Sequence, residues 1–430
     1  MSLLTSLASG TSGLSSASAD LAVIGDNIAN ANTVGFKAGR AAFEDTLAQT
    51  VIGGNGQIGL GSRLQAVQKL ITQGALSNTG VSTDLALQGN GFFEVRGTTG
   101  DGRNGTYLTR AGQFTVDTSG FLVNLDGLRV QGYAADPVGN ITSALGDLQV
   151  GNATSQPSPS TAITLKANLQ ADAPLPAAWD PLNPAATSNF STSATIYDSL
   201  GKSYQVQMYF ARTGNGTWDW HAMTDGGGVV GGTPGVPAQI ATGALTFDAA
   251  GRLTSPPSAP QVFNPLNANP QPLTFDFGTP YVAGGTATGL EGITQFASPS
   301  ASTFVGQDGF APGELTSVQI DKKGTVLGVF TNGQTRALAR VGVARVAAQD
   351  QLERVGGNLY GLTPSSGDAV MGAAGEGGRA FISAGTLEGS NVDIAEQFVK
   401  MIAAQRAFEA NSKTITTADQ LMSELIQMKR

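Results

Sequence analysis

The N-terminal thirty residues carry apolar or small side chains at alternating spacings of three and four. These positions are Leu3, Leu7, Gly10, Leu14, Ala17, Leu21, Ile24, Ile28 and Ala31. This spacing is the a/d pattern of a helix that packs against other helices. Gly10 and Gly13 each lower the helix propensity by about 1 kcal/mol, so we expect the first turns to depend on packing partners.

The C-terminal forty residues repeat this pattern. Apolar residues lie seven apart, and three of them are followed three positions later by another small or apolar residue: the set is Ile394, Met401, Ala404, Phe408, Ile415, Ala418, Met422 and Leu425. Asn391, Ile394 and Glu396 indicate the turn that leads into a helix. Lys429 and Arg430 suit its C-terminal end. At about 1.5 Å per residue each end could form a helix roughly 40–60 Å long, and we expect the two ends to pair.

Strand patterns dominate the middle of the chain, as short β-branched and aromatic runs separated by Gly, Asn, Asp and Pro. A strand, then Asp-x-x-Gly, then another strand occurs in FTVDTSGFLV from Phe114, TIYDSLGKSYQV from Thr195, LTFDAAGRLT from Leu245 and VQIDKKGTVLGVF from Val318. Asp favours the first position of a type I turn, and Gly can close it as a hairpin with a bulge. The spacing differs from that of a calcium-binding loop, so we interpret these Asp residues as turn residues.

Shifts in composition divide this β region. Stretches rich in Pro, Ser, Ala, Gly or Thr bracket a central module; they are residues 150–160, 171–186, 255–272 and 283–292. We interpret that module as an insertion into a second β module made from both of its flanks. The predicted fold is mainly β with α-helical termini: long N- and C-terminal helices form a coiled-coil-like domain, and two barrel- or sandwich-like β domains are nested by insertion. The predicted boundaries are 1–33 with 388–430 for the helical domain, 34–80 with 360–387 for a connecting segment, 81–146 with 291–359 for the inner β domain, and 147–290 for the outer β domain.

Composition and charge exclude several functions. The chain has 430 residues, with 24 basic and 32 acidic side chains, a net charge of −8, one histidine and no cysteine. This acidic balance gives no electrostatic footprint for nucleic acid or an anionic membrane. Without cysteine there is no disulfide, thiolate nucleophile or cysteine-ligated metal. Because no G-x-S-x-G motif accompanies His221, we interpret it as a structural or surface residue and expect no enzyme activity, cofactor or metal.

Hydropathy gives no sign of a membrane protein. No apolar run reaches 18 residues, so we expect no membrane insertion. The N-terminal MSLLTSLASGTSGLSS lacks the basic region and continuous apolar core of a secretory signal peptide. We expect the protein either to be cytoplasmic or to leave the cell by a route that reads no such signal.

Residues 54–59 match the G-x-G-x-x-G pattern of dinucleotide-binding proteins. That fingerprint needs a preceding strand and a helix that opens within it. We expect residues 41–52 to be helix-like or irregular and residues 64–71 to be strand or loop. In a chain with 58 glycines a chance match is expected, so we predict no nucleotide binding.

Both ends of the chain carry a family resemblance. Residues 12–37, SGLSSASADLAVIGDNIANANTVGFK, resemble the rod and hook proteins of the bacterial flagellum, with the family's typical residues at Asn27, Asn30, Asn32, Gly35, Phe36 and Lys37. Residues 385–426 are similar to the matching C-terminus, at Leu387, Glu388, Ser390, Asn391, Val392, Asp393, Gln405, Arg406, Glu409, Ala410 and Asn411. The two ends match in register, which makes the resemblance specific.

The interior resembles the hook members of this family more than the rod members, which are typically shorter and lack a large inserted domain. Residues 306–335 match the hook pattern of a strand, a turn and Asn-Gly-Gln, residues 197–210 resemble the start of the outer domain, and residues 89–95 are shared by rod and hook. The resemblance implies a structural subunit that self-assembles into the flagellar hook, a flexible tubular universal joint that transmits motor torque from rod to filament.

The resemblance also implies partners and a location. The subunit would form a homo-oligomeric helical tube, with rod proteins at the proximal end and hook-cap and hook–filament junction proteins at the distal end. It would be exported by the flagellar type III apparatus without a cleavable signal peptide, and would lie in the extracellular hook attached to the basal body. We expect the terminal helices to be largely disordered until neighbouring subunits supply their partners.

The residues expected to carry subunit assembly combine members of both terminal patterns and the nearby Phe398 with three of the family positions. They are Leu7, Leu14, Leu21, Ile24, Ile28, Asn30, Asn32, Phe36, Ile394, Phe398, Met401, Phe408, Ile415, Met422 and Leu425. The same periodicity also fits an intramolecular helical hairpin packed on one domain.

Two other functions stay open from the sequence. The chain could be a distal rod component with an unusual insertion, in which residues 43–70 would form a rod-specific contact. It could instead be a secreted β-rich carbohydrate-binding protein or enzyme that uses Trp218 and Trp220, although paired catalytic carboxylates cannot be located.

Overall fold

The computed structural model describes residues 3–50 and 57–428 of the chain. The chain forms two compact units: unit 1 contains Met1–Ala153, Leu315–Val329 and Thr335–Arg430, and unit 2 contains Thr154–Glu314 and Phe330–Gln334. Unit 2 is therefore inserted into unit 1. The composition placed the return to the inner module near residue 291, whereas the chain returns at Leu315, because β19 (Ala301–Gln307) pairs with β12 (Ala162–Asn168) inside unit 2.

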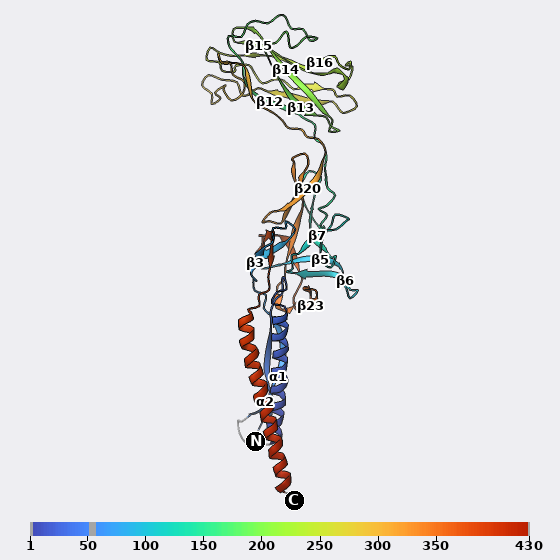
Figure 1. The fold of residues 1–430 in the computed structure, drawn as a ribbon, viewed down its shortest axis with the longest axis vertical. Coiled ribbons are helices and arrows are strands. Elements are labelled where there is room, and N and C mark those ends of the chain that lie inside the picture. The colour runs from blue at the N-terminus through green and yellow to red at the C-terminus, as the bar shows by residue number, and fades with distance from the viewer. Residues whose placement is uncertain (1–2, 51–56, 429–430) are drawn as a thin grey trace. The chain divides into compact units, whose positions relative to one another are not determined.

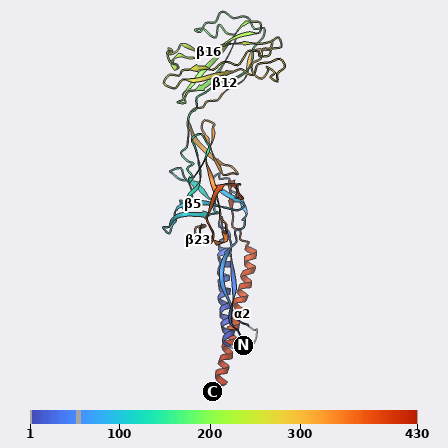
Figure 2. The same cartoon turned by 180° about the vertical axis from the view of Figure 1, so that it is seen from behind.

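Unit 1 contains both long helices, α1 (Leu3–Ala29) and α2 (Ile394–Met428). They lie side by side and run antiparallel (Figures 1 and 2). The helices approach closely at two glycines: a Cβ added at Gly13 would lie 2.6 Å from Oδ1 of Asn411, and one added at Gly10 would lie 3.0 Å from Cγ1 of Ile415. The glycines thus leave space for α2, and the expected pairing of the two ends is confirmed.

The helix α2 begins at Ile394, directly after the predicted entry segment, and Asp393 caps it. The backbone N–H groups of Ala395 and Glu396 donate to Oδ1 of Asp393 at 2.9 and 3.1 Å. A side-chain acceptor at this position satisfies N–H groups that have no partner within the first turn. Lys429 and Arg430 lie outside the described residues.

Residues 41–52 were expected to be helix-like or irregular, and this prediction was wrong for 41–50. The strand β1 (Gly39–Thr50) pairs antiparallel with β2 (Gln57–Lys69), and the hairpin lies along α1. Register shifts after Ala42 and after Asp45 interrupt the two-residue alternation, which hid the strand in the sequence. The first part of the G-x-G-x-x-G match lies outside the described residues, and its last part belongs to β2.

The other strands that lie mostly in unit 1 form the inner β region. They are β3 (Leu76–Asn78), β4 (Leu85–Gln88), β5 (Phe92–Thr98), β6 (Asn104–Thr109), β7 (Phe114–Val116), β8 (Leu122–Asn124), β9 (Arg129–Ala135), β10 (Ile141–Asp147), β20 (Gly313–Ile320), β21 (Thr325–Phe330), β22 (Thr335–Arg345), β23 (Glu353–Gly356), β24 (Leu359–Gly361), β25 (Val370–Ala373), β26 (Phe381–Ala384) and β27 (Thr386–Glu388). The main sheet runs β20-β21-β22-β9-β5-β6-β24-β23, over a core that includes Phe93, Phe114 and Val341. Two small pairs, β4 with β26 and β3 with β27, hold the chain that leads into α2.

Unit 2 is a β-sandwich of two four-stranded sheets around one core. Besides β12 and β19, its strands are β11 (Thr154–Ser155), β13 (Phe190–Tyr197), β14 (Ser203–Gly214), β15 (Thr217–Asp225), β16 (Pro237–Thr246), β17 (Gln261–Phe263) and β18 (Gln271–Asp276). One sheet has the order β17-β18-β12-β19, and the other has the order β13-β14-β15-β16. In the core, the ring of Trp220 lies 4.8 Å from Phe275 and 5.0 Å from Phe277. Trp218 and Trp220 are only 0 and 2 % exposed, so neither can stack on a sugar. The two residues on which the carbohydrate-binding interpretation rested are therefore core residues.

All four Asp-x-x-Gly segments form the predicted turn. In each, the Gly N–H donates to the Asp carbonyl at 2.9–3.0 Å, and the Gly φ is positive, at +75 to +84°; the pairs are Asp117 with Gly120, Asp198 with Gly201, Asp248 with Gly251 and Asp321 with Gly324. Each Asp Oδ1 also accepts hydrogen bonds from backbone N–H groups two and four residues later. Each Asp side chain therefore holds its own turn together. Asp136 and Gly139, outside the four predicted segments, make the same backbone turn.

Candidate functional site

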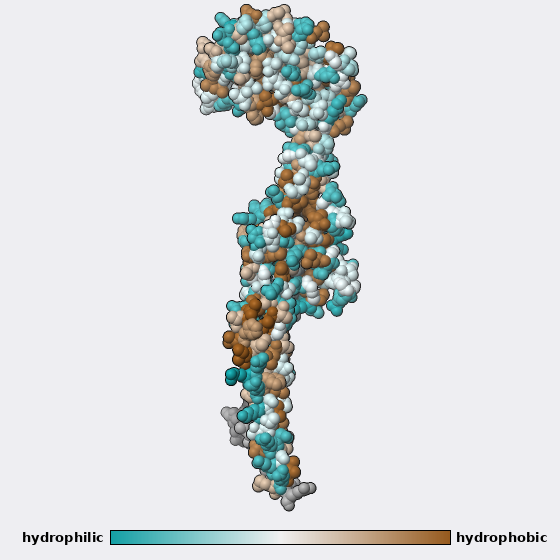
Figure 3. Space-filling model, viewed as in Figure 1, coloured by the Kyte–Doolittle hydropathy of each residue, from teal (hydrophilic) through white to brown (hydrophobic). Residues whose placement is uncertain are grey.

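Large apolar side chains remain exposed on the first turns of α2. They are Ile394, Phe398, Val399 and Ile402, which are 45–68 % exposed. Figure 3 shows apolar atoms gathered at this end of the helix. Gln397, Met401 and Ala404 in the same turns are buried or half-buried, so the helix keeps one side for α1 and leaves the other side open. We call the four exposed residues the outer face of α2.

The predicted assembly residues of α2 divide between these two sides. Ile394, Phe398 and Phe408 are exposed, whereas Met401, Ile415 and Met422 are half-buried. The heptad spacing by itself therefore does not distinguish the exposed from the half-buried positions of α2. Leu425 belongs to α2, but its side chain lies outside the described part of the structure.

The predicted assembly residues of α1 lie at contacts within the chain as well. Ile24 is 3 % exposed, and Leu7, Leu14, Leu21 and Ile28 are half-buried. The helix contacts both α2 and the β1–β2 hairpin. The two terminal helices thus form an intramolecular pair, in agreement with the second interpretation of their periodicity.

The three family positions added to the assembly residues have different surroundings. Asn30 ends α1: its Nδ2 donates to the Asp26 carbonyl at 2.9 Å, and its Oδ1 accepts from Thr33 Oγ1 at 3.1 Å. Phe36 is 5 % exposed and lies under the guanidinium of Arg354, with 4.7 Å between Cζ and the ring centre. Asn32 is exposed. Asn30 and Phe36 therefore stabilise their own chain where α1 gives way to β1.

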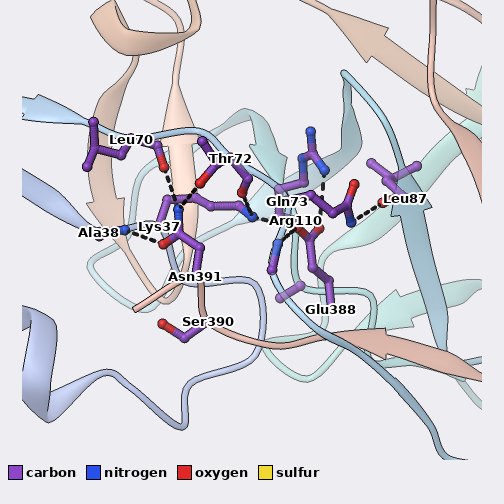
Figure 4. Close-up of polar contacts among 12 residues, drawn as sticks. Lys37, Ala38, Leu70, Thr72, Gln73, Leu87, Arg110, Glu388, Ser390 and Asn391 are labelled. Atoms are coloured by element: carbon purple, nitrogen blue, oxygen red, sulfur yellow. Dashed lines mark hydrogen bonds and ion pairs between the residues drawn. The ribbon is translucent and has the colours of Figure 1, made fainter. Parts of the chain in front are cut away.

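A buried charge cluster lies at the point where both helices meet the inner β region (Figure 4). Glu388, six residues before α2, accepts from Lys37 Nζ at 2.5 Å through Oε1 and from Arg110 Nη1 at 3.2 Å through Oε2. The side chains of Lys37, Glu388 and Arg110 are 0, 0 and 2 % exposed. We call these three residues the junction cluster.

Backbone groups add hydrogen bonds to the cluster, while Nε of Arg110 is buried without a partner among the described residues. The Gly74 N–H donates to Glu388 Oε1 at 2.9 Å, and Lys37 Nζ donates to the Thr72 carbonyl at 2.7 Å. Arg110 Nη2 donates to the Gly89 carbonyl at 2.8 Å. Each charge therefore has hydrogen-bonding partners, as buried charges require.

Asn391, three residues after Glu388, joins the same segments by side-chain hydrogen bonds. Its Oδ1 accepts from the Ala38 N–H at 2.8 Å, and its Nδ2 donates to the Leu70 carbonyl at 2.7 Å and to Thr72 Oγ1 at 2.8 Å (Figure 4). The Gly35 N–H donates to the Glu388 carbonyl at 2.8 Å. The segments after α1, after β2 and before α2 are thus held to one another by hydrogen bonds.

Burial determines the electrostatics of this cluster. Desolvation lowers the pKa of Lys37, while the nearby Glu388 raises it and the positive charge of Arg110 lowers it further. Desolvation also lowers the pKa of Arg110, again opposed by Glu388. Glu388 is the side chain that compensates both cations.

No sequence pattern marks the junction cluster as a site. Lys37, Glu388 and Asn391 stand at family positions, but the predicted assembly residues are apolar or neutral. Arg110, between β6 and β7, carries no pattern that would connect it with residues 278 positions away. Its signal is only chemical: a charged residue within an apolar stretch needs a partner when it is buried.

His221, the chain's one histidine, is held by contacts with neighbouring side chains. His221 stacks on Trp179 with 3.9 Å between ring centres, and its Nδ1 lies 2.9 Å from Thr242 Oγ1. Among the described residues, no group of three or more His, Asp or Glu side chains is placed to hold a metal ion. Within the same residues, no helix has the length and apolar character needed to cross a membrane.

Four protein-family models match the chain along its length. They are the flagellar basal body rod protein over residues 7–37, the flagellar hook protein FlgE/F/G D1 domain over 86–171, the flagellar basal body protein FlaE D2 domain over 168–310, and the flagellar basal body rod FlgEFG protein C-terminal over 383–428.

Known hook proteins match almost the entire chain. The flagellar hook protein FlgE of Borreliella burgdorferi is 34 % identical over 99 % of this chain and 100 % of that protein. FlgE of Escherichia coli is 32 % identical over 97 % of this chain and 98 % of that protein. The crystal structure of Helicobacter pylori flagellar hook protein FlgE2 aligns with a TM-score of 0.47 and 17 % identity over 73 % of this chain and 100 % of that one. Because FlgE proteins are 32–34 % identical to it over nearly its full length, the chain belongs to the bacterial flagellar hook protein family and is a structural subunit of the flagellar hook.

Proposed function

We propose that copies of this subunit assemble through the terminal helices, with the outer face of α2 as a principal contact. The observation that carries the proposal is the exposure of Ile394, Phe398, Val399 and Ile402 on a helix that already has an intramolecular partner. Full burial of a large apolar side chain stabilises by about 1.5–3 kcal/mol, and these four side chains, at 45–68 % exposed, would each gain part of that on association. A contact between different surfaces of successive copies gives an open helical tube.

The two-unit architecture supports a role as a flexible coupling. Each unit has its own apolar core, with Trp220 and Phe275 in unit 2 and Phe93 and Val341 in unit 1. Units with separate cores can change their orientation without breaking their own sheets. We therefore propose that the assembled tube bends as a universal joint while it transmits motor torque from rod to filament.

The partners and the route of export are part of the same proposal. The tube would contact rod proteins at its proximal end and hook-cap and hook–filament junction proteins at its distal end. The subunit would reach the extracellular hook through the flagellar type III apparatus without a cleavable signal peptide. The full-length similarity to known flagellar hook proteins supports the location in the hook.

Polymerisation of the purified full chain tests the assembly surface. Phe398→Asp should abolish tubes in high salt, seen by negative-stain electron microscopy, because it places a charge on the outer face of α2. Leu200→Asp is the matched control: Leu200 is also exposed, at 67 %, but lies in unit 2. Normal tubes from Phe398→Asp would contradict the proposed surface.

The source bacterium provides a second test. Replacing the native gene with the Phe398→Asp variant should leave basal bodies that end at the rod, whereas the Leu200→Asp strain should make hooks. Loss of the rod as well would point to a role in the rod instead.

A further inference from the structure

The junction cluster combines two cations and one anion in a desolvated space. Lys37 follows α1, Arg110 follows β6, and Glu388 precedes α2. All three side chains are at most 2 % exposed. Among the described residues, the ion pairs of Lys37 and of Arg110 are both formed with Glu388. The positive charge of Arg110 acts on Lys37, so the two cations lie close enough to repel each other.

The order of the three residues along the chain bears on the order in which the segments can dock. A buried charge without a counterion is far more costly than a paired one, and two like charges in low dielectric add their repulsion. Lys37 and Arg110 belong to the part of the chain that is synthesised first, whereas Glu388 follows Arg110 by 278 residues. Before Glu388 is present, packing residues 35–38 against the Arg110 loop buries two uncompensated cations.

We infer that the junction cluster is a lock closed by Glu388: the segments that connect α1 to the inner β region dock only after the C-terminal segment supplies the anion. The segment that follows α1 is thereby kept from docking until the C-terminal segment is in place. This device concerns the order of folding within one chain, and it is independent of the proposed assembly surface.

Hydrogen bonds around the cluster provide local probes of the lock. The Ala38 N–H donates to Asn391 Oδ1, and the Gly389 N–H donates to the Ala75 carbonyl at 2.7 Å. Neither of these amides bonds to the Glu388 carboxylate. Their hydrogen exchange therefore reports whether the whole junction is closed, not merely whether one hydrogen bond has been lost.

Three single variants of the full chain separate charge compensation from packing. Glu388→Gln is nearly isosteric but leaves both cations buried without an anion. Lys37→Met and Arg110→Met each remove one cation and leave a balanced pair with Glu388. Breaking a buried pair by removing one partner is strongly destabilising, so exchange at Ala38 and Gly389 should accelerate roughly a hundredfold or more in Glu388→Gln. Both methionine variants should change exchange less, although they alter the side chain more.

A double variant keeps the test decisive if Glu388→Gln unfolds unit 1. Adding Lys37→Met to Glu388→Gln removes one of the two uncompensated cations, so protection at Ala38 and Gly389 should partly return. Amides of the unit 2 core, such as that of Trp220, should exchange as in the native chain in every variant and serve as the internal control. The inference is overturned if Glu388→Gln exchanges like the native chain, if either methionine variant loses as much protection as Glu388→Gln, or if the double variant recovers nothing.

Discussion

The side-chain amide of Asn27 joins α1 to α2 and to β1 at once. Its Nδ2 donates to Gln397 Oε1 at 3.2 Å and to the Gly39 carbonyl at 2.8 Å, and its Oδ1 accepts from the Gly39 N–H at 2.8 Å. Asn27 is 2 % exposed, and Gln397 is 6 % exposed. One buried amide therefore sets the register between two segments 370 residues apart.

Asn27→Ala should destabilise unit 1 by about 2–4 kcal/mol, because it leaves buried polar groups of Gly39 and Gln397 without partners. Urea unfolding followed by circular dichroism at 222 nm measures this loss, since both long helices belong to unit 1. All three tryptophans lie in unit 2, so their fluorescence should report an unchanged transition. Asn32→Ala, at an exposed position, is the matched control and should change neither signal.

Gly35→Ala should disrupt the junction. Gly35 has a φ of +72°, and an added Cβ would lie 2.5 Å from the backbone nitrogen of Ala111. The left-handed conformation alone costs a non-glycine residue about 1–2 kcal/mol, and the backbone contact adds to that cost. The matched control is Gly127→Ala, with a φ of +79° and open space around the added Cβ. Equal losses of urea stability in the two variants would show that the close contact at Gly35 is unimportant.

Phe408→Asp should prevent polymerisation and leave both β cores folded. Phe408 is 37 % exposed, so the added charge affects the monomer little but opposes burial between copies. Ile28→Asp should also prevent polymerisation, and because Ile28 is half-buried it should lower the stability of unit 1 too. Negative-stain electron microscopy checks both, and normal tubes from both variants would remove these residues from the assembly surface.

Unit 2 should lose stability as the pH falls below about 6.5. Burial lowers the pKa of His221, while Asp219 and Gln239 oppose this shift. The unfolded chain then binds the proton at a higher pH than the folded chain does. The free energy of unfolding therefore decreases as the pH falls from the ordinary histidine pKa, about 6.5, to the lowered pKa of the folded state. Tryptophan-monitored urea titrations at pH 7.5 and 5 measure the decrease. His221→Gln should remove this contribution, and an identical pH dependence in that variant would assign it to other groups.

The local chemistry of the turns was readable in the sequence. Asp117 with Gly120 and Asp321 with Gly324 form the predicted geometry because the acceptor, the left-handed glycine and the backbone donors all lie within five consecutive residues. The terminal helices and the mainly β interior were predicted for the same reason, since periodicity is a property of neighbouring positions. The β1 strand was missed because its register shifts break that periodicity.

The sequence alone predicted the terminal helices, the four Asp-x-x-Gly turns and the mainly β interior, and its resemblance indicated the family. Tertiary packing sets which side of α2 remains open, because α1 covers the side of Gln397, whose Oε1 accepts from Asn27, and leaves Phe398 and Val399 exposed. It also decided that Lys37, Arg110 and Glu388 share one buried site. Their pairing follows from the packing of segments that are distant along the chain, and no local pattern encodes such a meeting.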